Sequence, residues 1–186
     1  VSTLEAIKFL KSDKSKRYIQ VYDQQDLEEA SVKKYPKIIK NNWMFVNPIH
    51  LIDYFNIFGR GKIKHIKNFK ILNKNKLHIL NAHIQFSSGD FGQYNSVWNM
   101  PGPWAVIITT KFTRFEIRPL EILKYQKRGS RILKNIKMNY KKDRKFKAGL
   151  INQATQIYLL LKKKKNNLVK IKESISLMNL ISKIYK

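Results

Sequence analysis

Hydrophobic residues in the first third of the chain recur at helical spacing. In residues 3–12 the apolar positions lie one turn apart, behind a threonine that can cap a helix. Residues 23–35 place acidic residues early and lysines late, as a helix dipole favours, and Pro36 follows them. Residues 47–59 begin with Asn-Pro and end at Gly59, which are typical start and stop signals. The pattern predicts three helices, the third of them in the core.

The middle of the chain combines a basic helical pattern with short alternating stretches. Residues 60–72 have apolar residues at helical spacing between lysines, which predicts a fourth helix. Residues 77–86 alternate instead, with one change of parity that a bulge or turn would explain. A further strand is expected at residues 104–110, after a turn-rich segment. We therefore expect a small hairpin closed by a turn at Gly89 and Asp90, with the Asp90 carboxylate accepting hydrogen bonds from backbone N–H groups.

The last third of the chain contains no proline after residue 119, and residues 131–142 and 168–185 have helical periodicity. It also carries most of the positive charge. The elements together predict an α+β fold with three parts. These are a helical N-terminal region (1–46), an α+β RNA-binding core with a small helix-helix-hairpin module (47–119), and a basic helical C-terminal extension (120–186).

Charge indicates the class of partner. The 186 residues contain 38 Lys and Arg against 12 Asp and Glu, a net charge of +26, while 43% of the residues are hydrophobic. The apolar content excludes a disordered polybasic tail, and so much self-repulsion destabilises a compact state unless a polyanion neutralises it. Nucleic acid is the expected polyanion, and an anionic membrane surface is the second choice. No apolar run approaches the ~18 residues of a membrane span.

The composition also suggests a source. Lys, Asn, Ile, Phe and Tyr are abundant, all of them encoded by codons rich in A and T, and 31 of the basic residues are Lys while 7 are Arg. Phosphate binding gives no reason to prefer Lys so strongly, because Arg is the better bidentate ligand. We interpret the bias as that of an AT-rich, organellar genome, and an AT-rich nuclear genome is the alternative. The predicted location is the mitochondrial matrix.

A short motif in residues 51–91 indicates a particular family of nucleic-acid-binding proteins. Its residues stand in the order Ile71, Leu72, Asn73, Lys74, Lys76, Leu77, Ile79, Gly89, Asp90 and Phe91. This order resembles the hairpin of the ribosomal small-subunit protein four family. The Ser-Arg-x-x-Ala-Arg signature of that family is absent, and Arg60-Gly-Lys-Ile-Lys-His65 stands in its place. The resemblance implies that residues 71–72 and 77–80 pair as antiparallel strands joined by a tight turn through residues 73–76, and that this hairpin presents lysines to rRNA phosphates.

We accordingly expect a structural constituent of a mitochondrial ribosome, in the small subunit. Its expected partners are rRNA and neighbouring ribosomal proteins, with no small-molecule substrate, no cofactor and no metal. Binding would be electrostatic, through Lys and Arg contacts to phosphates. The predicted RNA-binding residues are Arg60, Lys62, Lys64, Lys67, Lys70, Lys74, Lys76, Lys127, Arg128, Arg131, Lys134, Lys141, Lys142, Arg144, Lys145, Lys162, Lys163, Lys164 and Lys165.

An enzyme is not expected, because the sequence shows no Ser/His/Asp arrangement and no Gly-rich phosphate loop. His78 and His83 have opposite parity across the expected turn, so they need not converge on a metal with Asp90. Two alternatives stay open. One is a basic accessory subunit of an inner-membrane complex. The other is a degenerate, homing-endonuclease-like DNA-binding protein, in which Asn152 stands where a metal-binding acid would be needed.

Overall fold

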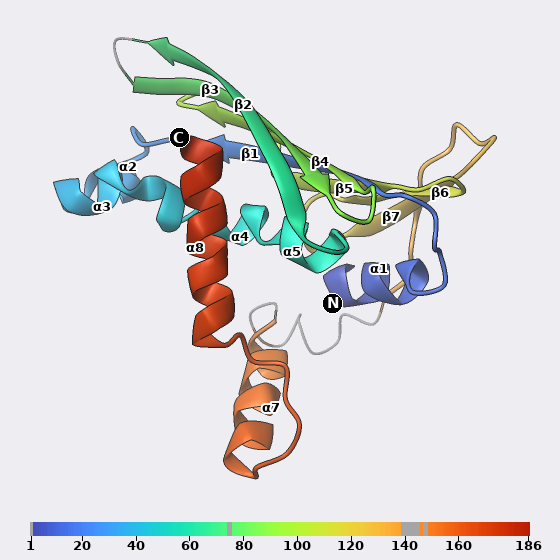
Figure 1. Cartoon of the computed structure of the whole chain (residues 1–186). Helices are drawn as coiled ribbons and strands as arrows, with labels where there is room; N and C mark the ends of the chain where they lie inside the picture. The colour runs from blue at the N-terminus through green and yellow to red at the C-terminus, as the bar shows by residue number, and fades with distance from the viewer. Residues whose placement is uncertain (1, 74–75, 139–145, 147–148) are drawn as a thin grey trace.

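The centre of the molecule is one eight-stranded mixed sheet with the strand order β2-β3-β4-β1-β5-β6-β7-β8 (Figure 1). The computed structural model describes residues 2–73, 76–138, 146 and 149–186. Within them, only β1 and β4 pair in parallel, and the other six pairings are antiparallel. The strands are β1 (Tyr18–Gln25), β2 (Ile63–Asn73), β3 (Lys76–Phe86), β4 (Phe91–Trp98), β5 (Ala105–Thr109), β6 (Thr113–Ile117), β7 (Leu123–Lys127) and β8 (Lys134–Asn135).

The helices lie on one side of this sheet. Figure 1 shows α1, α4, α5 and α8 beneath the strands, while α7 projects away from the body and no described helix covers the opposite face. The helices are α1 (Ser2–Leu10), α2 (Ala30–Lys33), α3 (Lys37–Asn41), α4 (Ile49–Ile52), α5 (Tyr54–Phe58), α7 (Leu150–Leu161) and α8 (Ile171–Tyr185), with a 3-10 turn η1 (Trp43–Phe45). None of the described helices is long and apolar enough to cross a membrane.

The core lies between the sheet and the helices. Along β1 and β4 every second residue is buried, as a half-covered sheet requires. Ile19 and Val21 of β1 belong to one cluster with Phe55 of α5 and with Leu180 and Ile181 of α8. Each such side chain contributes about 1.5–3 kcal/mol when it is fully buried. Packing on the sheet therefore fixes helices that are too short to be stable alone.

The predicted fold class is wrong. An α+β protein was expected, with a helical N-terminal part, a small helix-helix-hairpin RNA-binding module and a basic helical extension, but the described residues form one eight-stranded sheet with few helices. The segment predicted as a helix at residues 60–72 is the long strand β2. A bulge between Ile63 and His65 shifts the register there, so apolar residues at 63 and 66 imitate helical spacing while they serve a strand. The predicted helix at residues 23–35 is also wrong at its start, because residues 23–25 belong to β1.

Other local predictions are confirmed. The hairpin exists, since Leu72 pairs with Leu77 and Asn73 with Lys76, although each of its strands has 11 residues. The strand expected at residues 104–110 is β5, and the helix expected at residues 168–185 is α8. The expected basic helical extension is wrong as a fold description. Strand β7 continues the sheet, and α8 buries Leu177, Leu180, Ile181 and Ile184.

Candidate functional site

A tight turn with two glycines leads from α5 to β2. A Cβ atom on Gly59 would lie 2.4 Å from the Phe86 ring, so only glycine lets the backbone approach β3 this closely. Gly61 has φ +75°, a left-handed conformation that glycine adopts without strain. The turn brings the start of β2 against the end of β3 and opens a hollow beside α5.

Asp90 fastens this turn. Its buried carboxylate accepts hydrogen bonds from the backbone N–H groups of Arg17 (2.9 Å) and Arg60 (3.1 Å). The Arg60 guanidinium adds an ion pair at 2.6 Å. Desolvation raises the pKa of Asp90, but the hydrogen bonds from Arg60 and Arg17 outweigh it, so the net pKa lies below its ordinary value. The predicted role of Asp90 in its own turn is wrong, because its carboxylate binds the backbone N–H groups of the distant residues Arg17 and Arg60, and the ion pair with Arg60 was not predicted.

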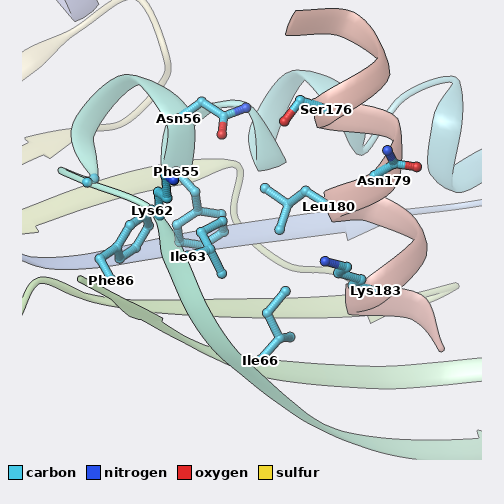
Figure 2. Close-up of a pocket in the computed structure, with 12 residues that line it drawn as sticks. Phe55, Asn56, Lys62, Ile63, Ile66, Phe86, Ser176, Asn179, Leu180 and Lys183 are labelled. Carbon is cyan, nitrogen blue, oxygen red and sulfur yellow. The ribbon is translucent and has the colours of Figure 1, made fainter. Parts of the chain in front are cut away.

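The hollow itself is a cavity of about 420 Å³ between α5, β2 and α8 (Figure 2). Its apolar floor consists of Phe55, Ile63, Ile66, Phe86 and Leu180. Its polar side chains are Asn56, Lys62, Ser176, Asn179 and Lys183. Three of these belong to α8, where spacings of three and four residues place them on one face of the helix. Figure 2 shows the Lys183 ammonium directed from α8 toward β2.

These side chains favour binding over proton transfer. None of the described residues in the lining is His, Asp or Glu, the residue types that most often carry acid–base chemistry. Amide, hydroxyl and ammonium groups can bind hydroxyl or anionic groups of a ligand, while the half-buried Ile63 and Ile66 can pack against its apolar face. Among the described residues, no group of His, Asp or Glu side chains is arranged to hold a metal.

A second polar cluster is buried beneath α8. The Tyr94 hydroxyl donates to Asp23 at 2.5 Å and lies 2.9 Å from the Tyr185 hydroxyl. Gln25 also donates to Asp23, at 2.5 Å. Burial raises the pKa of Asp23 to about 6, although the hydrogen bonds from Tyr94 and Gln25 oppose the shift. Because Asp23 is only 1% exposed, the cluster fastens the C-terminal helix to the sheet and does not meet a ligand.

The predicted RNA-binding residues do not form one surface. Arg60 is bound to Asp90, and Lys70 donates to the backbone carbonyl of Tyr185, while Lys62 lines the cavity. The other predicted residues that the structure describes are exposed, and they lie in three separate places (Figure 1). The first is β2 and β3, with Lys64, Lys67 and Lys76. The others are the segment from the end of β7 to β8 (Lys127, Arg128, Arg131, Lys134) and the end of α7 (Lys162, Lys163, Lys164, Lys165). Lys74, Lys141, Lys142, Arg144 and Lys145 lie outside the described residues.

Sequence comparison gives no relative. No protein-family model matches the chain, and no curated protein matches it. Solved structures do match. A dehydrogenase from Chromobacterium violaceum has a TM-score of 0.74 at 14% identity, over 99% of this chain and 57% of its own. Nearly the whole chain thus shares the fold of a little more than half of this dehydrogenase.

Two further neighbours are also oxidoreductases by their descriptions. They are the UDP-N-acetylglucosamine 3-dehydrogenase from Acidithiobacillus ferrooxidans (TM-score 0.73, 7% identity) and the aldose-aldose oxidoreductase from Caulobacter crescentus complexed with glycerol (0.72, 13%). They are matched over 99% and 98% of this chain and over 57% of their own lengths. The neighbours are oxidoreductases of the Gfo/Idh/MocA type. At such low identities the likeness establishes the fold alone, and the chain spans little more than half the length of these proteins.

These likenesses correct the functional predictions. The resemblance to the ribosomal small-subunit protein four family is wrong, because the neighbours over nearly the whole chain are dehydrogenases. The predicted ribosomal role, the rRNA and ribosomal-protein partners, the absence of a small-molecule substrate and the expectation of a non-enzyme are overturned by the same finding. The predicted phosphate-binding residues and the mitochondrial location are not tested by it and stay predictions.

The sheet is not built like a doubly wound dinucleotide-binding sheet. Such a sheet consists of parallel strands joined by crossover helices and carries a Gly-x-Gly-x-x-Gly turn after its first strand. Here only one of the seven described pairings is parallel, and the sequence contains no Gly-x-Gly-x-x-Gly. The described residues therefore do not form the dinucleotide site of a doubly wound sheet.

Proposed function

We propose that this chain forms the substrate-side part of an oxidoreductase that acts on a small polar molecule such as a sugar. The likeness to dehydrogenases over nearly the whole chain, with TM-scores from 0.72 to 0.74, carries the proposal. Two of these neighbours are described as acting on an aldose and on a nucleotide sugar.

The cavity beside α5 supports a ligand of this kind. Its volume of about 420 Å³ lies within the range of about 300–1,000 Å³ that is usual for small-molecule sites. A sugar ring offers hydroxyl groups on its edge and C–H groups on its face. The amide of Asn56, the hydroxyl of Ser176 and the ammonium of Lys183 can bind the former, while the half-buried Ile63 and Ile66 can pack against the latter.

Hydride transfer needs a cofactor, and the described residues form no doubly wound dinucleotide site. An oxidoreductase of this fold would obtain it from a dinucleotide-binding domain, either in the same protein or on another chain. The neighbours are long enough to include such a domain, because 57% of their length accounts for all that matches here. The residues described here would then bind and orient the substrate.

Calorimetric titration of the purified chain with glucose, N-acetylglucosamine and UDP-N-acetylglucosamine tests the proposal. The variant Ser176→Phe places a ring in the cavity, and Ser174→Phe places the same ring on an exposed position two residues away. We expect at least one of the sugars to bind, S176F to weaken that binding by about tenfold or more, and S174F to leave it unchanged. If none of the sugars binds, or if S176F binds as tightly as the unmodified chain, the proposal fails.

The same titration with NAD⁺ and NADP⁺ tests whether the cofactor binds outside the residues of this chain. We expect no binding to the chain alone. A stoichiometric complex with either dinucleotide would show that the cofactor site lies within these residues.

A further inference from the structure

The helix α7 turns its apolar side outward. Leu150, Ala154, Ile157 and Leu161 are separated by four, three and four residues, so they follow one side of the helix, and Tyr158 lies beside them. These five residues form what we call the outer face of α7. The Leu161 side chain is 76% exposed, and those of Leu150, Ile157 and Tyr158 are between 44% and 59% exposed.

The opposite side of α7 is the one held to the chain. The side-chain oxygen of Gln156 accepts a hydrogen bond from the backbone N–H of Asn167 at 2.8 Å, which ties the helix to the segment that follows it. Gln156 and Leu159 are accordingly half-buried. In Figure 1 α7 projects away from the sheet and the other helices. A surface helix ordinarily buries its apolar side, so the reverse arrangement marks a binding surface.

A run of cations adjoins this apolar face. Lys162–Lys165 follow α7 directly, and all four are exposed. The sequence has no acidic residue between Asp143 and Glu173 to neutralise them. Lys163 has φ +53°, a left-handed conformation that glycine usually takes at a helix end and that costs a residue with a side chain. Lysine is abundant throughout this chain, so the place of these four beside an exposed apolar face is what distinguishes them.

We propose that α7 and the lysines after it bind the surface of an anionic lipid membrane. The helix would lie along that surface, with its outer face among the upper parts of the acyl chains and Lys162–Lys165 at the acidic headgroups. At 12 residues, α7 is about 18 Å long, which suits a helix lying in the interface.

Other partners match only one of the two features. Nucleic acid would neutralise the lysines but offers no apolar medium for Leu150, Ile157 and Leu161. A second copy of this chain, whose net charge is +26, would cover the apolar face but would bring lysines against lysines. An anionic membrane satisfies the apolar face and the cations together, and the two contributions add.

Co-sedimentation of the whole chain with vesicles tests the proposal. The vesicles consist of phosphatidylcholine alone or of phosphatidylcholine mixed with phosphatidylglycerol. A chain of this charge can attach to anionic lipid through any cluster of lysines, so a matched pair of variants must locate the contact. Leu161→Asp places a carboxylate on the outer face of α7, and Asn152→Asp places the same carboxylate two and a half turns earlier, on the opposite side.

We expect the unmodified chain to bind the mixed vesicles and to bind phosphatidylcholine alone much more weakly. For N152D we expect a loss of about fivefold or less, the effect of one charge near an anionic surface. For L161D we expect a further loss of about tenfold or more, because a leucine leaves the acyl region and a carboxylate would have to enter it. Circular dichroism must show both variants folded, and Ile157→Asp replaces L161D if that variant is not.

Three results would overturn the proposal. The first is equal binding of L161D and N152D to the mixed vesicles, since lysines elsewhere would then make the contact. The second is binding to phosphatidylcholine alone as tight as to the mixture, since the lysines would then have no part in it. The third is a chain that binds an RNA duplex but not the mixed vesicles, since its lysines would then serve nucleic acid.

Discussion

Replacing Asp90 with alanine should destabilise the fold by about 3 kcal/mol. The change removes the ion pair to Arg60 and leaves the backbone N–H groups of Arg17 and Arg60 without their acceptor. Breaking a buried ion pair costs about 3–5 kcal/mol. The lower end applies here, because the Arg60 side chain is 30% exposed and can regain water, whereas the Asp90 side chain is fully buried. A loss of this size is a large part of the stability of an ordinary domain.

Urea denaturation with linear extrapolation measures the effect. Glu5→Ala is the control, because its ion pair with Lys8 has the same 2.6 Å length but joins side chains that are 30% and 70% exposed, and its loss should cost no more than about 0.5 kcal/mol. The pKa of Asp90 is lowered in the folded state, so its contribution is present above the unfolded pKa of about 4 and is lost as the pH falls below it. A D90A protein within 1 kcal/mol of the unmodified chain at pH 7 would refute the reasoning.

Two further predictions concern the helix side of the sheet. Because burial raises the pKa of Asp23 to about 6, the folded chain keeps a proton that the unfolded chain releases, so stability should fall as the pH rises from about 4 to 6, by about 3 kcal/mol from this group. Asp23→Asn should remove that slope in urea titrations at pH 4.5 and 7, and an unchanged slope would contradict the assignment. Ile181→Ala, at a fully buried position of α8, should cost about 2–4 kcal/mol, whereas Leu161→Ala, at a position 76% exposed on α7, should change little. Equal losses in the two variants would show that α8 does not belong to the core.

Local signals in the sequence predicted several elements because each depends on neighbouring residues. Alternation in residues 77–86 gave a strand, and the helical period after residue 168 gave α8. The turn before β4 was predicted from Gly89 and Asp90, and Gly89 does adopt a left-handed conformation there with φ +83°. The arrangement of these elements in one sheet was not predicted, since the parallel pairing of β1 with β4 joins residues more than seventy positions apart.

The wrong local predictions also arise from contacts between segments that are distant in the sequence. Residues 23–25 are polar and acidic enough to favour a helix start, yet they complete a strand, because Asp23 and Gln25 are satisfied by Tyr94 and Trp43 from distant segments. The cavity was likewise invisible in the sequence. Ser176 and Lys183 lie more than one hundred residues from Ile63, and only the packing of α8 brings them together. The two glycines at 59 and 61 were the one local sign of a close backbone approach beside it.

Net charge misled the functional prediction, and the reason lies in where the charge is. A chain whose lysines served one polyanion would gather them on one surface, but here the exposed ones occupy β2 and β3, the turn before β8 and the end of α7, which are far apart in Figure 1. The excess of Lys over Arg, 31 against 7, had already argued that codon composition rather than phosphate recognition supplied the charge. If that pressure acts on every exposed position, a position that stays uncharged is more informative than one that is charged. The outward positions of the adjacent strands β3, β4, β1 and β5, on the face opposite the helices, are such a region, since none of them is Lys, Arg, Asp or Glu.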